Sequence, residues 1–330
     1  MKTLAVSFPQ PRSVELVEQE VPDPGPGQVL TRTLVSLLST GTEMWCYRGE
    51  FDEETTWANW VRFPFTPGYQ SVGVVVAIGE GVEGIEPGDR VFLTAGHVGY
   101  VVSDAGAVVK VPEDVSEEDA AWAALAFISQ TGVRRANHSM GDTAVVIGLG
   151  PLGQMVVQYL RVIGLREILA VDTVPLRLDA ALAHGATAAF CGSAADARDF
   201  VLQHTDGMLA DVVYDVTGHY AVLPMALRLA RDFGVVELIG DTPHPSKQHI
   251  TQDILARQVT LIGTHNAKLG PGAFWTVQRQ IQLFYLYLSR GQMRAADLIT
   301  HRFRPQQAAE CYQLLDTDRG STIGVMFDWR

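Results

Sequence analysis

Short apolar and β-branched runs dominate the first part of the chain. These runs are separated by turns rich in glycine and proline, such as PGPG. Examples of the runs are LAVSF, SVGVVVAIG, DRVFLTA and GYVVSD. Many short strands with such turns and few long helices are typical of a small barrel or sandwich. The pattern therefore predicts a β-rich domain over roughly the first 110 residues.

The pattern becomes helical near residue 117 and then alternates. Residues 117–137 are rich in alanine, with acids in the first turn, which predicts one helix. From Thr143, strands such as TAVVIG and EILAVD alternate with helices such as PLRLDAALAHG. The helical segment HYAVLPMALRLAR contains Pro224, which predicts a kink. Repeated alternation of this kind predicts a doubly wound parallel sheet.

The end of the chain reads as helix followed by one short strand, TIGVMFDW. We interpret this tail as a return to the first domain. The predicted fold class is α/β, with a β-rich domain of residues 1–118 completed by residues 270–330. The second domain, residues 119–269, carries the parallel sheet.

A glycine-rich loop opens the first helix of the parallel-sheet domain. Gly148-Leu149-Gly150-Pro151-Leu152-Gly153 follows the strand AVVI. In such a loop the first glycine permits the tight turn, the second lets the backbone approach a pyrophosphate, and the third allows close packing of helix on strand. A plain glycine turn is the alternative, but the strand before it and the helix after it favour a dinucleotide site.

One acid indicates which dinucleotide binds. Asp172 ends the second strand, where a carboxylate accepts hydrogen bonds from ribose hydroxyls and repels a 2′-phosphate. NAD(H) is therefore predicted over NADP(H). Arg177 lies one helical turn later. Its side chain is predicted either to pack over the adenine or to pair with a neighbouring acid. Thr217, Gly218 and Gly240 follow later strands, at the sheet edge where ligands bind, and complete the predicted cofactor residues.

Charge and composition exclude several classes. The 330 residues include 25 Lys+Arg and 37 Asp+Glu, a net charge of −12, which argues against a nucleic-acid-binding protein. The three cysteines are sparse and distant, as in a reducing compartment. Neither a secretory signal nor a membrane span is predicted, since the one long uncharged stretch contains the glycine loop. We expect a cytoplasmic protein.

Several motifs resemble those of the medium-chain dehydrogenase/reductase superfamily, of the alcohol and polyol dehydrogenase type. Gly41-Thr42-Glu43 is similar to its Cys-Gly-Thr-Asp segment, and Gly68-Tyr69-Gln70 to its Gly-His-Glu segment. Gly88-Asp89-Arg90-Val91 matches a turn of its first domain. The resemblance spans nearly the whole chain and implies a GroES-like catalytic domain flanking a Rossmann domain, with a small-molecule substrate.

The chain departs from this pattern at every expected zinc ligand. Thr40 stands where the family has cysteine, Tyr69 where it has histidine, and Gln70 where it has glutamate. The third ligand falls near Ala124 or Phe127, and the four-cysteine lobe has no counterpart. Catalytic zinc needs three good ligands, so we predict no metal. Ser39–Glu43 and Pro67–Gly73 most resemble the bacteriochlorophyllide a dehydrogenase branch.

Without zinc, hydrogen-bonding side chains must polarise the substrate oxygen. The resemblance puts Thr42 at the proton-relay position, and Tyr69 can donate to a carbonyl or accept a proton if its pKa is lowered. Alternatively, both side chains merely fill the emptied metal site. His265, with Asn266, ends the strand VTLIGTHN and is the third catalytic candidate. His97 is a weaker candidate.

Glu43 and a segment rich in tryptophan are further candidates, each with a structural alternative. Glu43 is expected to give structural support, since the family's equivalent acid more often holds an arginine. The segment GEFDEETTWANWVRF reads as a substrate-side loop, and Trp45, Trp57 and Trp60 around it either stack on a ring or belong to the core.

The sequence thus predicts a zinc-independent, NAD(H)-dependent oxidoreductase that interconverts a secondary alcohol, whether sugar, polyol or ring-bearing, and a ketone. The alternatives are an enone or quinone reductase, and a dinucleotide-binding protein without turnover. An apolar strand last in the sheet, VTLIGTHN, further predicts a homodimer paired along that edge.

Overall fold

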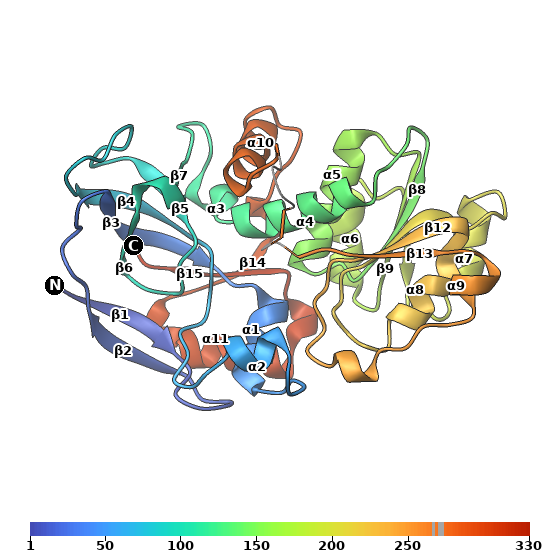
Figure 1. The fold of residues 1–330 in the computed structure, drawn as a ribbon, viewed down its shortest axis with the longest axis horizontal. Helices are drawn as coiled ribbons and strands as arrows, with labels where there is room; N and C mark the ends of the chain where they lie inside the picture. Colours follow the sequence, from blue (N-terminus) through green and yellow to red (C-terminus); the bar gives the residue numbers. More distant parts are fainter. Residues whose placement is uncertain (266–267, 270–273) are drawn as a thin grey trace. The chain divides into compact units, whose positions relative to one another are not determined.

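The structure, a computed structural model, describes residues 1–265, 268–269 and 274–330, so Asn266 and the expected boundary at Gly270 lie outside the described residues. The chain forms two compact units. The first contains residues 1–50, 56–124 and 277–330, and the second contains residues 51–55 and 125–276. Figure 1 shows the elements of both.

The first unit is built on two sheets. An antiparallel pair, β1–β2, stands beside a seven-stranded sheet with the order β14-β15-β3-β4-β5-β7, in which β6 also pairs with β3. The C-terminal strand β15, red in Figure 1, pairs antiparallel with the blue β3, so the tail does return to this sheet. The strands are β1 (Lys2–Ser7), β2 (Glu15–Glu20), β3 (Gln28–Leu37), β4 (Ser71–Ile78), β5 (Arg90–Leu93), β6 (Tyr100–Asp104), β7 (Val109–Lys110), β14 (Ile299–Phe303) and β15 (Gly324–Asp328).

Valines and leucines that alternate along these strands form the core of the sheet. Val29, Val75, Val91 and Leu93 are nearly inaccessible and pack together, as the period of two along a strand requires. Helices complete the unit: α1 (Thr40–Arg48), α2 (Thr56–Trp60), α3 (Glu117–Ala120), α10 (Val277–Ser289) and α11 (Ala308–Thr317). Helix α2 lies inside the segment that the sequence predicts as a loop.

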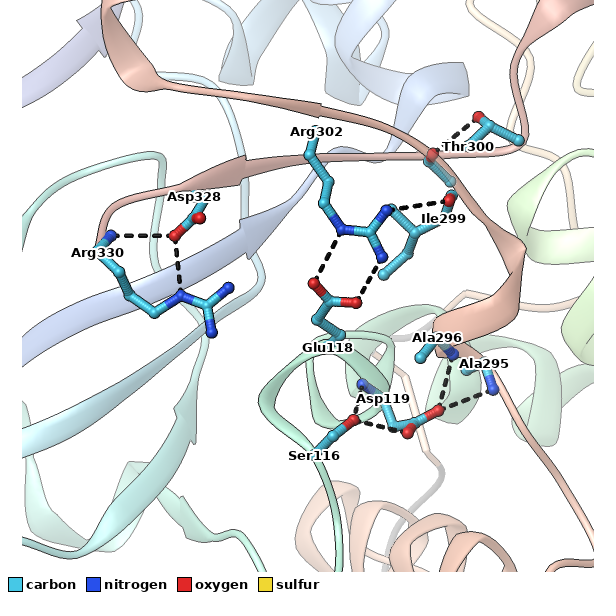
Figure 2. A network of polar contacts seen from close by, with 11 residues as sticks. Ser116, Glu118, Asp119, Ala295, Ala296, Ile299, Thr300, Arg302, Asp328 and Arg330 are labelled. Carbon is cyan, nitrogen blue, oxygen red and sulfur yellow. Dashed lines mark hydrogen bonds and ion pairs between the residues drawn. The ribbon is translucent and has the colours of Figure 1, made fainter.

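Charged contacts from α3 hold the C-terminal segment in this unit. Figure 2 shows both carboxylate oxygens of Glu118 accepting hydrogen bonds from Arg302 on β14, at 2.9 and 2.6 Å. Asp119 Oδ1 accepts from the backbone N–H groups of Ala295 and Ala296, at 2.9 and 2.7 Å. The side chain of Ser116 accepts from the Asp119 N–H and so caps α3.

The second unit is a six-stranded parallel sheet with the order β10-β9-β8-β11-β12-β13. This is the predicted doubly wound sheet, and the predicted fold class is confirmed. The strands are β8 (Thr143–Ile147), β9 (Glu167–Asp172), β10 (Ala188–Cys191), β11 (Ala210–Asp215), β12 (Ala230–Leu238) and β13 (Thr260–Gly263), and the helices are α4 (Ala123–Arg135), α5 (Pro151–Ile163), α6 (Pro175–His184), α7 (Arg198–His204), α8 (Leu223–Leu229) and α9 (Asp253–Ala256).

Buried aliphatic residues explain why the strands of this sheet form. Every residue of β8 is buried, as expected for a central parallel strand. One core cluster contains Val145, Leu169, Val213 and Val236, all inaccessible or nearly so. Helices α5 and α6 begin with a proline in the first turn, and each is followed by a glycine with positive φ, which are favoured start and stop residues.

Two helix predictions were wrong in detail. The expected helix over residues 117–137 is divided between α3 and α4, and Trp122, which is fully buried, lies in the break. Pro224 produces no kink, because α8 begins at Leu223 and the proline occupies its first turn. None of the helices that the structure describes has both the length and the apolar character needed to cross a membrane.

Candidate functional site

The glycine loop between β8 and α5 has the geometry that a dinucleotide needs. Gly148 has φ +91°, which a side chain would strain. A Cβ on Gly153 would lie 2.0 Å from the Gly148 carbonyl oxygen, so this position requires glycine. A Cβ on Gly150 would meet no atom within 4 Å. Gly150 is therefore not needed for packing, and the space above it is open.

Helix α5 begins at this open space. Gly150 is its N-cap residue, Pro151 is its first residue, and Leu152 and Gly153 follow. The N–H groups of a first helical turn have no acceptor within the helix, and they carry the positive end of the helix dipole. The loop and α5 can therefore hold a pyrophosphate.

Asp172 joins the end of β9 to the glycine loop. Its Oδ2 accepts from the Leu149 N–H at 2.6 Å, and its Oδ1 accepts from the Val174 N–H at 2.9 Å. Arg177, in the first turn of α6, is half-buried, and burial lowers its pKa while the nearby Asp172 carboxylate raises it. The nearby Asp172 is a candidate for the predicted acid partner of Arg177, and both predicted roles of Arg177 stay predictions.

The other predicted cofactor residues gather at the carboxyl ends of β11 and β12. A Cβ on Gly148 would lie 2.7 Å from Thr217 Cγ2, and a Cβ on Gly240 would lie 2.2 Å from the Gly218 nitrogen. Thr217 donates from its hydroxyl to Asp215 Oδ1 at 2.7 Å, and burial raises the pKa of Asp215 to about 6. These contacts place the loops after β8, β11 and β12 side by side.

An open pocket of about 890 Å³ lies at the carboxyl ends of β12 and β13. Gly240 and His265 both line it, together with Arg135, Asp241 and Lys268. His265 follows β13 by two residues and does not end it, contrary to the prediction. The predicted cofactor residues and His265 thus belong to the second unit.

Thr42 and Tyr69 come together in the first unit, with a residue that the sequence analysis missed. The Tyr69 hydroxyl donates to Ser39 Oγ at 2.6 Å, and Thr42 lies close enough to lower the pKa of Tyr69. We call Ser39, Thr42 and Tyr69 the hydroxyl cluster. Ser39 lies just before α1, in the motif Ser-Thr-Gly-Thr-Glu, and its position two residues after β3 was the available signal.

The pKa of Tyr69 decides between its two predicted chemical roles. Burial raises this pKa to about 12, although the neighbouring hydroxyls of Ser39 and Thr42 act to lower it. The condition for a base, a lowered pKa, is not met. A neutral phenol is a hydrogen-bond donor, so the geometry favours the donor role over proton acceptance.

The residues at the expected zinc positions do not fit the metal. Thr40 and Gln70 are almost completely buried, and neither offers a thiolate, imidazole or carboxylate. Ala124 and Phe127 are apolar. Among the described residues, no group of three or more His, Cys, Asp and Glu side chains could hold a metal ion.

The other candidate residues, Glu43, His97 and Trp57, are buried among protein side chains. Glu43 lies within α1 and accepts hydrogen bonds from His97 and Tyr312 instead of holding an arginine. His97 is completely buried. Trp57 is buried and Trp60 is half exposed, with ring centroids 6.1 Å apart. Burial of Trp57 supports the core interpretation for that residue.

Glu237 on β12 is a further buried acid that the sequence analysis missed. It is fully buried, and neither carboxylate oxygen has a hydrogen-bond partner among the described residues. Burial raises its pKa to about 8. The side chain is therefore mostly protonated at neutral pH.

Two models of known protein families match this chain. Residues 25–113 match the alcohol dehydrogenase GroES-like domain, and residues 151–281 match the zinc-binding dehydrogenase family. The chain belongs to the medium-chain dehydrogenase/reductase superfamily. It is an alcohol dehydrogenase-like oxidoreductase.

Individual relatives agree along most of the chain. The starvation-sensing protein RspB of Escherichia coli K12 is 25% identical, over 99% of this chain and 98% of the relative. The (R,R)-butanediol dehydrogenase of Bacillus subtilis is 29% identical, over 61% of this chain and 65% of that protein. A crystal structure described as the short-chain alcohol dehydrogenase RspB of E. coli CFT073 with NADH has a TM-score of 0.82 at 22% identity, covering 99% of each chain.

Proposed function

We propose that this protein is a zinc-independent oxidoreductase that prefers NAD(H) and interconverts a secondary alcohol and a ketone. The observation that carries the proposal is the hydroxyl cluster. Tyr69 donates to Ser39 Oγ, and Thr42 lies near the Tyr69 hydroxyl, next to Thr40, where the family pattern has a zinc ligand. Hydrogen-bond donors replace the metal at this position.

The second unit holds the coenzyme. The loop from Gly148 to Gly153 and the start of α5 receive the pyrophosphate, and Asp172 binds the adenosine ribose. The pocket with Gly240 and His265 receives the nicotinamide half, at the carboxyl ends of the strands. When bound, the nicotinamide ring supplies the hydride acceptor for alcohol oxidation.

In the first unit, hydroxyl groups stabilise the negative charge that develops on the substrate oxygen. As an alcohol is oxidised, its hydroxyl proton leaves and negative charge develops on oxygen, which prearranged donors stabilise. The Tyr69 phenol, which donates to Ser39 Oγ, and the nearby Ser39 and Thr42 hydroxyls are such donors. In a relay Tyr69 receives the proton of the substrate hydroxyl as it passes its own to Ser39, and Ser39 releases one proton to water, so no charged base at Tyr69 is needed.

The experiment is a screen on metal-stripped protein. We expect NAD⁺ reduction with at least one alcohol from a panel of 2,3-butanediol, polyols, sugars and ring-bearing secondary alcohols, after dialysis against a strong chelator. Turnover that appears only after zinc is added contradicts zinc independence. Tight NADH binding with no turnover on alcohols, ketones or enones contradicts the enzymatic proposal.

Replacing Asp172 tests the coenzyme preference. In Asp172→Ala we expect the dissociation constant for NADH to rise about tenfold more than that for NADPH, since a hydrogen bond to a charged group contributes roughly 1.5–3 kcal/mol. Both constants also rise somewhat, because the Leu149 N–H loses its acceptor. Arg177 remains beside the mutated position to receive a 2′-phosphate. Calorimetric titration with both coenzymes measures this, and equal losses contradict it.

We also propose a homodimer paired along β13. This strand is last in the six-stranded sheet, and Leu261 on it is 38% exposed. A strand pair across a two-fold axis satisfies its open backbone groups. We expect a dimer by light scattering at micromolar concentration and a largely monomeric Leu261→Lys variant. Met140→Lys, at a fully exposed position elsewhere, is the control. A monomeric wild type contradicts the proposal.

A further inference from the structure

Three buried polar side chains of the first unit form a second cluster that contacts the hydroxyl cluster. Glu43, His97 and Tyr312 are each no more than 1% exposed. They come from α1, from the turn before β6, and from α11. We call these three residues the Glu43 cluster.

The carboxylate of Glu43 is fully engaged. Its Oε1 accepts from the Ser39 N–H at 2.7 Å, and its Oε2 accepts from the Tyr312 hydroxyl at 2.6 Å. His97 Nε2 lies 3.0 Å from Oε2. An ionised carboxylate only accepts hydrogen bonds, so His97 carries a proton on Nε2. Three donors offset the cost of burying this charge, which is several kcal/mol for an unpaired ion.

Glu43 reaches Tyr69 by two routes. Through the first, the Ser39 N–H is held by Glu43 while Ser39 Oγ accepts from the Tyr69 hydroxyl. Through the second, the His97 ring lies against Gly68, where a Cβ would come within 2.8 Å of Nε2. Gly68 has φ +92° and immediately precedes Tyr69. Glu43 is thus hydrogen-bonded to Ser39, which accepts from the Tyr69 hydroxyl. It is also hydrogen-bonded to His97, which packs on the backbone of Gly68.

His97 is itself fixed from its other side. Its Nδ1 lies 2.8 Å from Ser36 Oγ, and Ser36 Oγ accepts from the Trp329 indole N–H at 2.9 Å. Since both ring nitrogens have partners, the imidazole cannot rotate without breaking two hydrogen bonds. The second route therefore runs through hydrogen bonds from Trp329, just after β15, to His97, which packs on Gly68.

We propose that Glu43 is a positioning residue: through Ser39 and His97 it fixes the direction of the Tyr69 hydroxyl. The two hydrogen-bonded routes carry this proposal. Burial raises the pKa of Tyr69 to about 12, and the negative charge of Glu43 acts in the same direction. The inference rests on the proposed function, because the direction of this hydroxyl affects turnover only if Tyr69 contacts the substrate.

The test is a double-mutant cycle of Glu43→Gln and Tyr69→Phe, assayed with the best alcohol from the screen. Glu43→Gln keeps the side-chain volume and the acceptor for Ser39, but it removes the charge that faces His97 and Tyr312. We expect kcat to fall about tenfold with little change in KM, and no further loss when Glu43→Gln is added to Tyr69→Phe. Losses that multiply overturn the proposal.

A matched control separates positioning from general stabilisation. Asp119 is another carboxylate of this unit that accepts two backbone N–H groups (Figure 2), and its partners are Ser116, Ala295 and Ala296. We expect Asp119→Asn to lower the melting temperature and leave kcat unchanged. If both variants lower kcat in proportion to their lost stability, Glu43 is only structural and the proposal fails.

A spectroscopic measurement provides a readout without substrate. With tyrosine labelled at Cζ, the Tyr69 resonance is assigned by its loss in Tyr69→Phe. We expect Glu43→Gln to shift this resonance and Asp119→Asn to leave it in place, and an unmoved resonance in Glu43→Gln overturns the proposal. If Glu43→Gln does not fold, Glu43→Asp, which keeps the charge but is one methylene shorter, takes its place in both experiments.

The two proposals fail in different ways. If Tyr69→Phe retains wild-type turnover, the proposed role of Tyr69 is wrong, whatever Glu43 does to the resonance. If Tyr69→Phe loses turnover but Glu43→Gln does not, the proposed function stands and the positioning role of Glu43 is wrong.

Discussion

Tyr69→Phe is expected to lower kcat by about 10²–10³, the usual loss when one prearranged donor to a developing oxyanion is removed. Phenylalanine keeps the ring and its packing, so only the hydroxyl is lost. Because the pKa of Tyr69 is about 12, the phenol is protonated throughout the neutral range. The loss should therefore be the same at every pH from about 6 to 9.

The control for this prediction is Tyr47→Phe. Tyr47 lies on α1 in the same unit, and its hydroxyl donates to the Arg12 carbonyl oxygen at 3.1 Å, away from the hydroxyl cluster. We expect it to retain wild-type kinetics. If Tyr69→Phe does so as well, Tyr69 only fills space, and Thr42 or His265 becomes the leading group for proton transfer.

Much of the second unit could be predicted because its signals are local. Strand β9 and helix α6 have the residues expected from the sequence, since the apolar pattern, Pro175 and Gly185 all mark the same boundaries. The glycine loop is equally local, with all three glycines within six residues. Local consistency of this kind makes a nucleotide-binding unit readable from one sequence.

The surroundings of the catalytic candidates could not be predicted, because they depend on contacts between distant segments. The Tyr312 hydroxyl meets Glu43 across a separation of 269 residues, and His97 meets Glu43 across 54. No periodic pattern encodes such pairs. The resemblance to a family suggested an arginine partner for Glu43, and the residues of this chain form a different cluster.

Packing also overrode helix propensity at one position. Residues 117–137 have a continuous helical pattern, yet the helix breaks where Trp122 is buried. A Cβ on Gly324 would lie 2.6 Å from Trp122 Cζ2, so the indole is seated on the C-terminal strand. A contact with a strand some 200 residues away decides this boundary.

Gly150→Val is expected to abolish coenzyme binding and leave the fold intact. The position meets no atom within 4 Å and has φ −66° and ψ −170°, a conformation that valine adopts readily. We expect the free energy of unfolding to change by no more than about 0.5 kcal/mol. The new methyl groups occupy the space where the pyrophosphate approaches the backbone, so the NADH dissociation constant should rise by at least about a hundredfold.

Gly153→Ala, unlike Gly150→Val, should lower the stability of the fold. Its Cβ would lie 2.0 Å from the Gly148 carbonyl oxygen, a backbone atom that can move only if the loop or α5 shifts. Overpacking of this kind costs on the order of 1–3 kcal/mol, so the melting temperature should fall clearly. Fluorescence titration with NADH and thermal unfolding measure both variants, with Gly106→Val as the open-space control in the first unit. If Gly150→Val binds NADH normally, the pyrophosphate does not lie above this loop and the proposed coenzyme site is wrong.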